Sequence, residues 1–483
     1  MAFGWKVHGD GRTPPPGEVV RPDERLSWGR TAGLGAQHVI AMFGATFVFP
    51  LIMGLDPNLA ILMSGAATIL FLLIVQGRVP SYLGTSASFV GAVVAIRAAG
   101  GTDATVTGAI LVAGLVLVVA GVLIAVAGPR VLHRVLPPAV TGAVVMLIGF
   151  NLAPVVADVY WPQDQWVALL TMTAVIVMSV LLRGFWARIA VLLGLIFGFV
   201  LSALFDLAGQ VTSVLPGQNL RDVAGQPCTA EGTYCVAAPF AHDRVDLSAV
   251  GSAPWFGLPD FFAPSFQTSA ILLALPAVIA LIAENTGHVK AVAEMTGADL
   301  DPVMGRAIAA DGVGTALASA VGGSPTTTYA ENIGVMAATR VYSTAAYYAA
   351  AGIAILFGLC PKFGALVAAT PGGVLGGITV VLYGMIGLLG AKIWVENRVD
   401  FANPVNLVPL AAGIILAIGN TTLQVTEGFS LAGIALGTIV TVLGYHVVRA
   451  LAPAHLQDPP GGTTIAVGPA YEGSGGEVDT RRP

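Results

Sequence analysis

The sequence predicts an all-α polytopic membrane protein with 14 transmembrane segments in a 7+7 inverted repeat. Three observations support this fold class. Hydrophobic residues make up 55% of the 483-residue chain and charged residues only 10%, whereas soluble domains carry about 25% charged residues. Residues 110–127, 167–182 and 431–448 contain no Asp, Glu, Lys or Arg, and each run approaches the roughly 20 residues that cross about 30 Å of hydrocarbon. The 60 glycines suit close helix packing in lipid.

The apolar runs divide the chain into two repeats between polar ends. Residues 1–30 are expected to form a flexible, basic cytoplasmic tail, residues 31–207 the first seven-span repeat, and residues 208–265 a polar extracytoplasmic loop. Residues 266–452 give the second repeat, and the Gly/Pro-rich residues 453–483 are expected to form a disordered cytoplasmic tail. The expected spans lie near residues 33–54, 58–76, 83–98, 105–127, 137–156, 166–182, 188–207, 266–289, 304–321, 328–339, 342–360, 372–390, 405–419 and 429–450.

The basic residues support this span count. If the N-terminus is cytoplasmic, the 22 Lys and Arg residues all fall on the cytoplasmic side except Arg97, Arg221, Arg244 and Lys362, in keeping with the positive-inside rule. If the count were wrong by one span, these basic residues would be divided between the two sides of the membrane. No cleavage-site pattern precedes the first apolar run, so no removable signal peptide is expected. The chain is therefore predicted to cross the cytoplasmic (inner) membrane many times, with both termini in the cytoplasm.

Two of the expected spans are short and irregular, and each is the third span of its repeat. These are residues 83–98 and 328–339, and the second follows Ser324, Pro325 and three threonines and carries Glu331. Lipid tolerates broken backbone only where protein or a water-filled cavity satisfies its polar groups. Paired interrupted spans at matching places indicate the midplane site of a transporter. Spans 3 and 10 are therefore predicted to be broken and to form the floor of a substrate site.

Intramembrane acids supply the candidate chemistry. Glu284 and His288 are four residues apart in the eighth span and share one helix face. Glu331 lies at the start of a half-helix, where free backbone N–H groups carry partial positive charge. Two carboxylates with exposed amides suit a small, flat, neutral molecule such as a uracil-like imide. Structural alternatives stay open: Glu284 and His288 could join two helices, Tyr329 could simply pack, and Asp311 leans toward a structural role.

The chain around Glu331 resembles the nucleobase–ascorbate transporter family, also called nucleobase–cation symporter family 2. Within this family, the bacterial uracil and pyrimidine permeases look most similar. The family motif is Gln or Glu followed by Asn-x-Gly-x-x-x-x-Thr and Arg or Gly, and it is met by Glu331-Asn332-Ile333-Gly334 through Thr339-Arg340. The runs from Gln37 to Thr46 and from Val79 to Ser86 are also similar to those permeases. The resemblance covers roughly residues 30–450, so it is specific.

This resemblance implies fourteen spans in a core domain and a gate domain, with substrate held between half-helices three and ten. It implies a symporter, not an enzyme, that imports uracil or a related pyrimidine nucleobase with a proton and uses no cofactor or metal. A homodimer in the lipid bilayer is expected by resemblance alone. Carried over by position, proton coupling falls to Glu284 and His288, and substrate binding to Glu284, Glu331, Tyr329, Ala330 and Ala87.

Two departures from the family pattern leave the substrate open. Uracil permeases tend to have Gly at position 330 and an aromatic residue at position 87, where this chain has Ala, so thymine or xanthine could replace uracil. The first alternative is a proton- or sodium-coupled xanthine or purine permease of the same family. The second is an anion transporter on a similar inverted-repeat fold. An intramembrane enzyme is disfavoured because the chain lacks a His-Glu-x-x-His pair and a Gly-x-Ser-x-Gly turn. No nucleic acid partner is expected, and pairing of Cys228 with Cys235 is left open.

Overall fold

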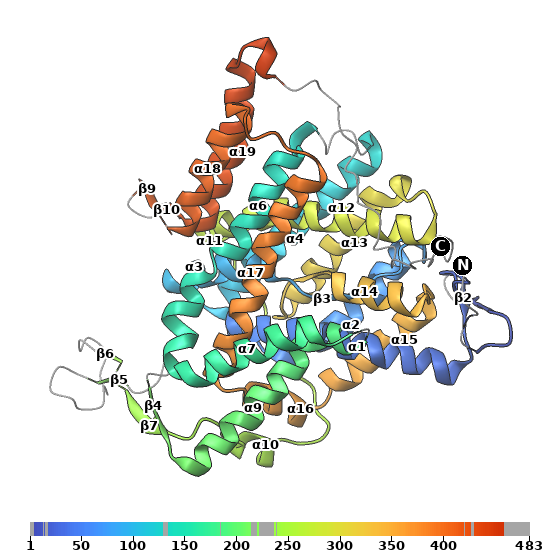
Figure 1. The fold of residues 1–483 in the computed structure, drawn as a ribbon, viewed down its shortest axis with the longest axis vertical. Coiled ribbons are helices and arrows are strands. Elements are labelled where there is room, and N and C mark those ends of the chain that lie inside the picture. The colour runs from blue at the N-terminus through green and yellow to red at the C-terminus, as the bar shows by residue number, and fades with distance from the viewer. Residues whose placement is uncertain are drawn as a thin grey trace, which may run out of the picture.

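The computed structural model describes residues 4–12, 14, 18–128, 134–183, 185–213, 220–221, 236–237, 239–419, 421–426 and 429–457, and this part is mostly helical (Figure 1). Within it, seven helices are long and apolar enough to cross a membrane, or up to nine if each bent helix pair is one span. Shorter apolar helices of 10–17 residues are Ala87–Arg97, Gln165–Leu181 and Pro404–Ile418. The chain is therefore a helical membrane protein with broken spans. Cys228, Cys235 and the tail from residue 458 lie outside the described residues.

Each span predicted in the first half contains a helix. The helices are α1 (Trp28–Met53), α2 (Pro57–Ile74), α3 (Val90–Ala98), α4 (Asp103–Ala127), α6 (Pro138–Phe150), α7 (Gln165–Leu181), α8 (Phe185–Arg188) and α9 (Ala190–Ala208). Two short strands, β1 (Lys6–Val7) and β2 (Glu24–Arg25), precede α1. Strand β3 (Leu83–Thr85) and the helical turn η1 (Ala87–Phe89) lead into α3, and the turns η2 (Val155–Tyr160) and η3 (Trp161–Gln163) follow α6.

The second half repeats this alternation of long helices with one broken segment. Its helices are α11 (Thr268–Ala274), α12 (Pro276–Thr296), α13 (Asp301–Ala320), α14 (Ala330–Thr339), α15 (Thr344–Gly358), α16 (Pro361–Ala368), α17 (Gly372–Glu396), α18 (Pro404–Ile418) and α19 (Gly433–Leu451). Strand β8 (Thr326–Thr328) precedes α14, and the pair β9 (Thr422–Thr426) and β10 (Phe429–Ala432) precedes α19. The connection between the halves holds β4 (Val211–Ser213), β5 (Leu220–Arg221), β6 (Val236–Ala237), β7 (Phe240–His242) and α10 (Ser248–Ser252), and η4 (Ala454–Leu456) follows α19.

Contacts between helices define two groups. In the first group, α4 lies along α13, α2 lies along α15, and α1 contacts both α2 and α15. In the second group, α17 contacts α6 and α7, α7 lies along α9, and α18 lies beside α19, as Figure 1 shows. Glycines permit the close approach of α4 and α13: a Cβ added at Gly312 would lie 2.7 Å from the Gly114 carbonyl oxygen. Small residues at helix contacts are the expected device in lipid.

The two broken spans cross each other as buried antiparallel strands. β3 and β8 form a ladder (the β3–β8 ladder) in which Leu83 pairs with Thr328, Gly84 with Thr327 and Thr85 with Thr326. All six residues are buried. Backbone groups that a continuous helix would satisfy internally are thus hydrogen-bonded between the two halves of the chain, which removes the cost of non-helical backbone at membrane depth. The prediction that both spans are broken is confirmed.

Two matching hydrogen bonds close the ends of this ladder. The backbone N–H of Tyr329 donates to the carbonyl oxygen of Tyr82 at 3.0 Å, and that of Ser86 donates to the carbonyl oxygen of Pro325 at 2.9 Å. Each bond joins the residue after one strand to the residue before the other. The chain therefore leaves each strand in a defined direction, and a helical turn begins at the next residue in both cases.

The segment before α1 is ordered where the structure describes it, so the prediction of a flexible tail is wrong for these residues. β1 pairs with β2. The backbone N–H of Val20 donates to the Arg340 carbonyl oxygen at 2.9 Å, and its carbonyl oxygen accepts from the Tyr342 N–H at 2.8 Å. Trp5 Nε1 donates to the Thr344 hydroxyl at 2.8 Å. The segment before α1 thus pairs with the chain that follows α14. Composition alone does not reveal a pairing between residues so far apart in the sequence.

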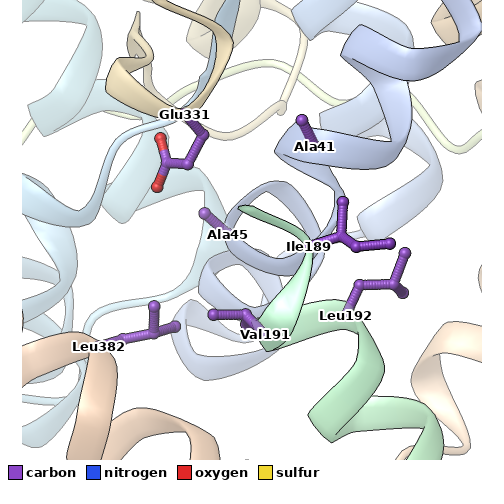
Figure 2. Close-up of a pocket in the computed structure, with 7 residues that line it drawn as sticks. All are labelled: Ala41, Ala45, Ile189, Val191, Leu192, Glu331 and Leu382. Carbon is purple, nitrogen blue, oxygen red and sulfur yellow. The ribbon is translucent and has the colours of Figure 1, made fainter. Parts of the chain in front are cut away.

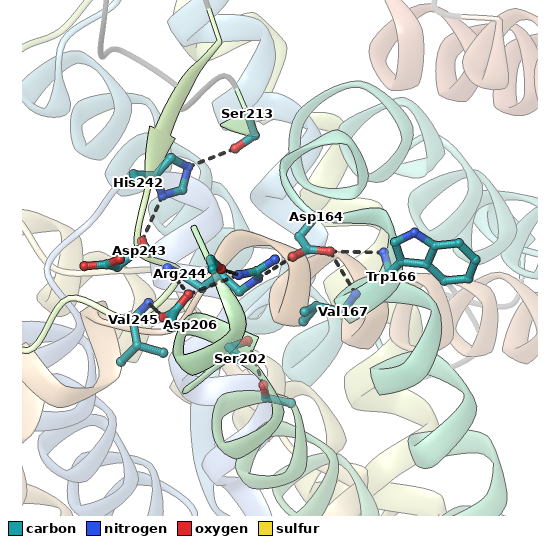
Figure 3. Close-up of polar contacts among 12 residues, drawn as sticks. Asp164, Trp166, Val167, Ser202, Asp206, Ser213, His242, Asp243, Arg244 and Val245 are labelled. Carbon is teal, nitrogen blue, oxygen red and sulfur yellow. Dashed lines mark hydrogen bonds and ion pairs between the residues drawn. The ribbon is translucent and has the colours of Figure 1, made fainter. Parts of the chain in front are cut away.

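A cluster of ion pairs holds the connection between the halves against α7 and α9 (Figure 3). Arg244 Nε donates to Asp164 Oδ2 at 2.6 Å, and its Nη1 donates to Asp206 Oδ1 at 3.1 Å. The three side chains are only 13%, 9% and 15% exposed. Asp164 also accepts from the backbone N–H groups of Trp166 and Val167 and so caps α7. One arginine therefore joins the start of α7 to the end of α9.

The same connection then crosses to the first helix group. The N–H of Gly257 donates to the carbonyl oxygen of Leu359, which follows α15, at 3.0 Å. The N–H of Ser265 donates to the carbonyl oxygen of Ala104 in α4 at 2.8 Å. Residues 239–265, the strap, are thus fixed to the second helix group at one end and to the first at the other.

Replacing Arg244 by Ala is expected to lower the stability of the fold, because Asp164 and Asp206 then remain largely buried without their cation. Removing one partner of a buried ion pair costs about 3 kcal/mol or more. Thermal melting of the purified protein in detergent should show a fall of several degrees. Arg244→Lys keeps the charge but loses the forked contact, so its melting temperature should lie between those of the wild type and Arg244→Ala. Equal melting temperatures for all three proteins would contradict a stabilising role for this cluster.

Candidate functional site

The β3–β8 ladder holds the starts of the two half-helices near each other. β3 leads through Ser86 into η1 at Ala87, and β8 leads through Tyr329 into α14 at Ala330. The first N–H groups of a helix have no partner within it and carry partial positive charge. Ala330 and Glu331 are exposed although the strand before them is buried. The start of α14 therefore opens on a cavity within the protein, and Ala87, at the other half-helix, is half-buried.

Helix α12 brings two more of the predicted residues to this region. It packs against β8, α14 and η1, and the side chains of Glu284 and His288 on it are half-buried. His288 Nδ1 lies 2.8 Å from the Thr328 hydroxyl oxygen. Glu284 is close enough to Asp311 on α13 and to Glu331 for their charges to interact. The structure thus brings Glu284, His288 and Glu331 together, whereas the role of each stays a prediction.

A cavity lies beside Glu331, between helices of both groups (Figure 2). Figure 2 shows the Glu331 side chain extending from α14 into this space. The other lining residues are apolar and come from α1, the start of α9 and α17: Ala41, Ala45, Ile189, Val191, Leu192 and Leu382. Small-molecule sites typically combine apolar walls with a few polar groups that fix orientation. The cavity therefore combines apolar walls with one carboxylate.

Tyr329 packs between the broken spans and contributes little to the cavity surface. Its side chain is 4% exposed. Its hydroxyl donates to the Thr85 carbonyl oxygen at 2.7 Å and accepts from the Thr46 hydroxyl on α1 at 3.2 Å. Its ring covers Gly84, where an added Cβ would lie 2.5 Å from the ring carbons, so only glycine fits there. This position favours the packing alternative for Tyr329 over direct contact with substrate.

The asparagine of the family motif holds α14 against α1. Asn332 Nδ2 donates to the His38 carbonyl oxygen at 3.0 Å and lies 3.2 Å from His38 Nδ1. His38 is itself 1% exposed, and its ring centroid lies 4.3 Å from that of Tyr347. Because Asn332 faces α1, the preceding residue, Glu331, is left to face the cavity. The motif therefore combines one anchoring residue with one exposed carboxylate.

Sequence reasoning missed the cavity walls and the contacts of Asn285. Ala41 and Ala45 lie one turn apart on α1, and two small residues at that spacing were a usable sign of space beside a helix. The apolar residues of α9 and α17 gave no signal, because Ile, Val and Leu are ordinary in membrane helices. Asn285 Nδ2 lies 2.6 Å from Asp311 Oδ2. Within the described part of the chain, no group of three His, Cys, Asp or Glu side chains could hold a metal ion.

Comparison with known proteins settles the family. Residues 29–426 match the profile described as Permease family. The chain belongs to this permease family. The resemblance to nucleobase–ascorbate transporters in the sequence around Glu331 is thereby confirmed. The permease is accordingly a membrane transporter and not an enzyme.

The permease is similar over most of its length to several bacterial proteins. It is 44% identical to the protein of Escherichia coli strain K12 that is named 'Putative pyrimidine permease RutG', over 92% of this chain and 94% of that protein. It is 36% identical to the uracil permease of Bacillus caldolyticus, over 88% and 93% of the two chains. The uracil permease of Escherichia coli strain K12 is 33% identical over 88% and 92%.

Solved structures of two transporters share the fold. The transmembrane domain of a cyanobacterium bicarbonate transporter, BicA, superposes with a TM-score of 0.54 at 14% identity, over 86% of the permease and 96% of that chain. The murine anion transporter Slc26a9 in its inward-facing state gives a TM-score of 0.61 at 11% identity, over 89% and 70% of the two chains. Identities this low establish a common fold and carry no information about substrate.

Proposed function

We propose that the permease is a proton-coupled symporter that imports uracil or a related pyrimidine nucleobase across the cytoplasmic membrane. Relatives named for pyrimidine or uracil transport are 44%, 36% and 33% identical to it over most of both chains. Those names support a pyrimidine over a purine or xanthine. They also favour a neutral base over an anion, although the fold is shared with anion transporters.

The observation that carries this proposal is the exposed start of α14 beside the acidic face of α12. Uracil presents alternating N–H and carbonyl groups around a flat ring. Glu331 accepts from one N–H group in a charge-assisted hydrogen bond, and Glu284 accepts from the other. The free backbone N–H groups near Ala330 and Ala87 donate to the carbonyl oxygens, as helix starts do for other electron-rich groups. The apolar cavity wall formed by α1, α9 and α17 covers the ring carbons.

Proton coupling is proposed to centre on Glu284, with His288 in support. Glu284 lies near both Asp311 and Glu331, and like charges in a region of low dielectric repel strongly. A proton bound at Glu284 relieves this repulsion and turns the carboxylate into a hydrogen-bond donor as well as an acceptor. Glu331 keeps its charge more readily, because it stands in the first turn of α14. Because the proton and the base would bind at adjacent groups, transport of one would be linked to transport of the other.

The arrangement of elements supports 14 spans in a 7+7 inverted repeat, with residues 31–207 and 266–452 as the two repeats. Thr68 on α2 accepts from the backbone of β3, and Thr315 on α13 accepts from that of β8. The two repeats also make matching helix contacts. The contact of α4 with α13 corresponds to the contact of α15 with α2, because the repeat relates α4 to α15 and α13 to α2. The first helix group corresponds to the core domain and the second to the gate domain.

The remaining assignments follow from this architecture. Both termini lie in the cytoplasm, the region 208–265 lies outside the cell membrane, and α3 and α14 are half-helices three and ten. Basic residues on the cytoplasmic side support this orientation. Formation of a homodimer stays a prediction from family resemblance.

Uptake of radiolabelled uracil by proteoliposomes that contain the purified permease tests the function. An inward proton gradient is expected to drive accumulation, and a protonophore should reduce it to the level of empty liposomes. Excess unlabelled thymine should compete more strongly than xanthine, because the relatives of the permease are named for pyrimidine or uracil transport. Accumulation driven by a sodium gradient, or strong competition by xanthine with none by thymine, would contradict the proposal and favour a xanthine or purine permease.

A further inference from the structure

A chain of buried hydrogen bonds begins at the amide of Asn285 on α12, which is 0% exposed. Asn285 Nδ2 donates to the Leu281 carbonyl oxygen at 3.0 Å and to Asp311 Oδ2 at 2.6 Å. A backbone carbonyl oxygen can only accept a hydrogen bond, so the nitrogen of this amide must face Leu281. The orientation of the Asn285 amide is therefore determined. Asp311 takes the second hydrogen of Nδ2 and holds the amide from the side of α13.

This orientation determines the direction of the next two hydrogen bonds. Asn285 Oδ1 faces β8 and accepts from the Thr328 hydroxyl at 3.0 Å. A hydroxyl has a single hydrogen, so the Thr328 oxygen can only accept in its other contact, with His288 Nδ1 at 2.8 Å. Neutral His288 must therefore carry its hydrogen on Nδ1. Within the described residues, the structure shows no side-chain hydrogen bond to Nε2, and the backbone of Thr328 also interacts with the ring.

We propose that Asn285, Thr328 and Asp311 are positioning residues that keep neutral His288 in its Nδ1–H form, so that Nε2 is the ring nitrogen through which His288 takes up and releases a proton in support of Glu284. This inference rests on the proposed proton-coupled function. When Nε2 takes a proton from water in the cavity, the ring becomes a cation with a hydrogen on both nitrogens. Release from Nε2 restores the same neutral form. The bond from Nδ1 to Thr328 persists throughout, and the ring needs no rotation.

Other groups that titrate near His288 belong to three elements. They are Glu284, one turn before His288 on α12 itself, and the two groups that interact with Glu284, Asp311 on α13 and Glu331 on α14. β8, η1, α6 and α11 also pack against α12 and contain no titratable side chain. α4 and α19, which contact α12 as well, carry theirs near one end of the helix: Asp103, Tyr445, His446 and Arg449. The pH dependence of uptake therefore reflects the titration of three carboxylates as well as the imidazole. A measurement that reports the protonation of the His288 ring itself is needed.

Nitrogen NMR of the permease labelled with ¹⁵N-histidine reads the ring directly, because protonated and unprotonated ring nitrogens resonate apart. The chain has 7 histidines, and the His288 signals are those lost in His288→Gln. The wild-type permease is expected to show protonated Nδ1 and unprotonated Nε2 at neutral pH. Thr328→Val removes the hydroxyl that accepts from Nδ1 and should raise the share of His288 in the Nε2–H form. Thr328→Ser keeps the hydroxyl and should restore the wild-type signals.

The matched control is Thr286→Val on the same helix. The Thr286 hydroxyl donates to the Ile282 carbonyl oxygen within α12 at 2.7 Å, so its loss should leave the His288 signals unchanged. In proteoliposomes, Thr328→Val is expected to lower kcat for uracil about tenfold, a loss of about 1.4 kcal/mol, with little change in KM. Thr328→Ser should recover kcat, and the pH profile should shift in Thr328→Val alone.

Two outcomes would overturn the inference. One is a wild-type His288 that carries its hydrogen on Nε2, and the other is a Thr328→Val permease whose ring signals match the wild type. Either result stands against the inference even if uracil uptake is proton-driven. If the Nδ1–H form is found and responds to Thr328→Val but no uracil is transported, the positioning by Asn285 and Thr328 is supported and the proposed substrate is the part that fails.

Discussion

Replacing Glu331 by Gln is expected to weaken uracil binding about 10- to 100-fold while the fold is retained. Hydrogen bonds to a charged group contribute about 1.5–3 kcal/mol, and each 1.4 kcal/mol is a factor of about ten in affinity. Glutamine preserves the size of the side chain but removes the charge that faces the start of α14. The fold should survive, because α14 is held by Asn332, His38 and the β3–β8 ladder rather than by Glu331.

Calorimetric titration of the detergent-solubilised permease with uracil measures this effect. Glu294→Gln is the matched control, because Glu294 is an exposed carboxylate at the far end of α12. Its affinity should equal that of the wild type. A Glu331→Gln permease that binds uracil with unchanged affinity would remove Glu331 from the binding site. A permease that fails to fold would contradict the expectation that Asn332 and the ladder hold α14.

Glu284→Gln is expected to abolish proton-driven accumulation of uracil. Glutamine resembles a protonated glutamate but can neither release nor rebind the proton, so binding of base and proton is no longer linked. Wild-type uptake should fall as the external pH rises, because fewer protons are available to enter with the base. Uptake by the variant should not vary with pH and should only equalise uracil across the membrane.

Uptake into proteoliposomes at several external pH values, with and without a protonophore, distinguishes these behaviours. Exchange of labelled for unlabelled uracil, which needs no net proton movement, should persist in Glu284→Gln. The Glu294→Gln control should accumulate uracil normally. If Glu284→Gln still accumulated uracil in a pH-dependent way, the proton would have to be carried elsewhere, and His288 and Asp311 would be the next residues to replace.

The membrane class, the helix positions and the two broken spans were predictable from the sequence, because each depends on local composition. A long apolar run determines a helix wherever it lies, and a run such as Ser324-Pro325-Thr326 interrupts one. The register of the β3–β8 ladder was not predictable, because it pairs residues 83–85 with residues 326–328. Nothing in either tripeptide specifies the other, and the pairing arises only when the helices around both strands pack.

The candidate site divides in the same way. Glu284, His288 and Glu331 stand out in the sequence, because charged or titratable side chains in apolar runs are costly. Asn285, between two such residues, looked incidental, and its role depends on distances to Thr328 and Asp311 on other elements. The prediction of a flexible N-terminal segment failed for a related reason. Its prolines and arginines are typical of disorder, but Val20 finds backbone partners beside Arg340.

The β3–β8 ladder also limits how the chain can change in length. Alternate residues of a strand point to opposite faces, so one residue inserted or deleted next to β8 would turn every following strand side chain over. Thr328 would then leave both Asn285 and His288, and the start of α14 would rotate away from the cavity. Surface loops absorb insertions without such effects. At this crossing, therefore, the number of residues is as tightly constrained as their identity.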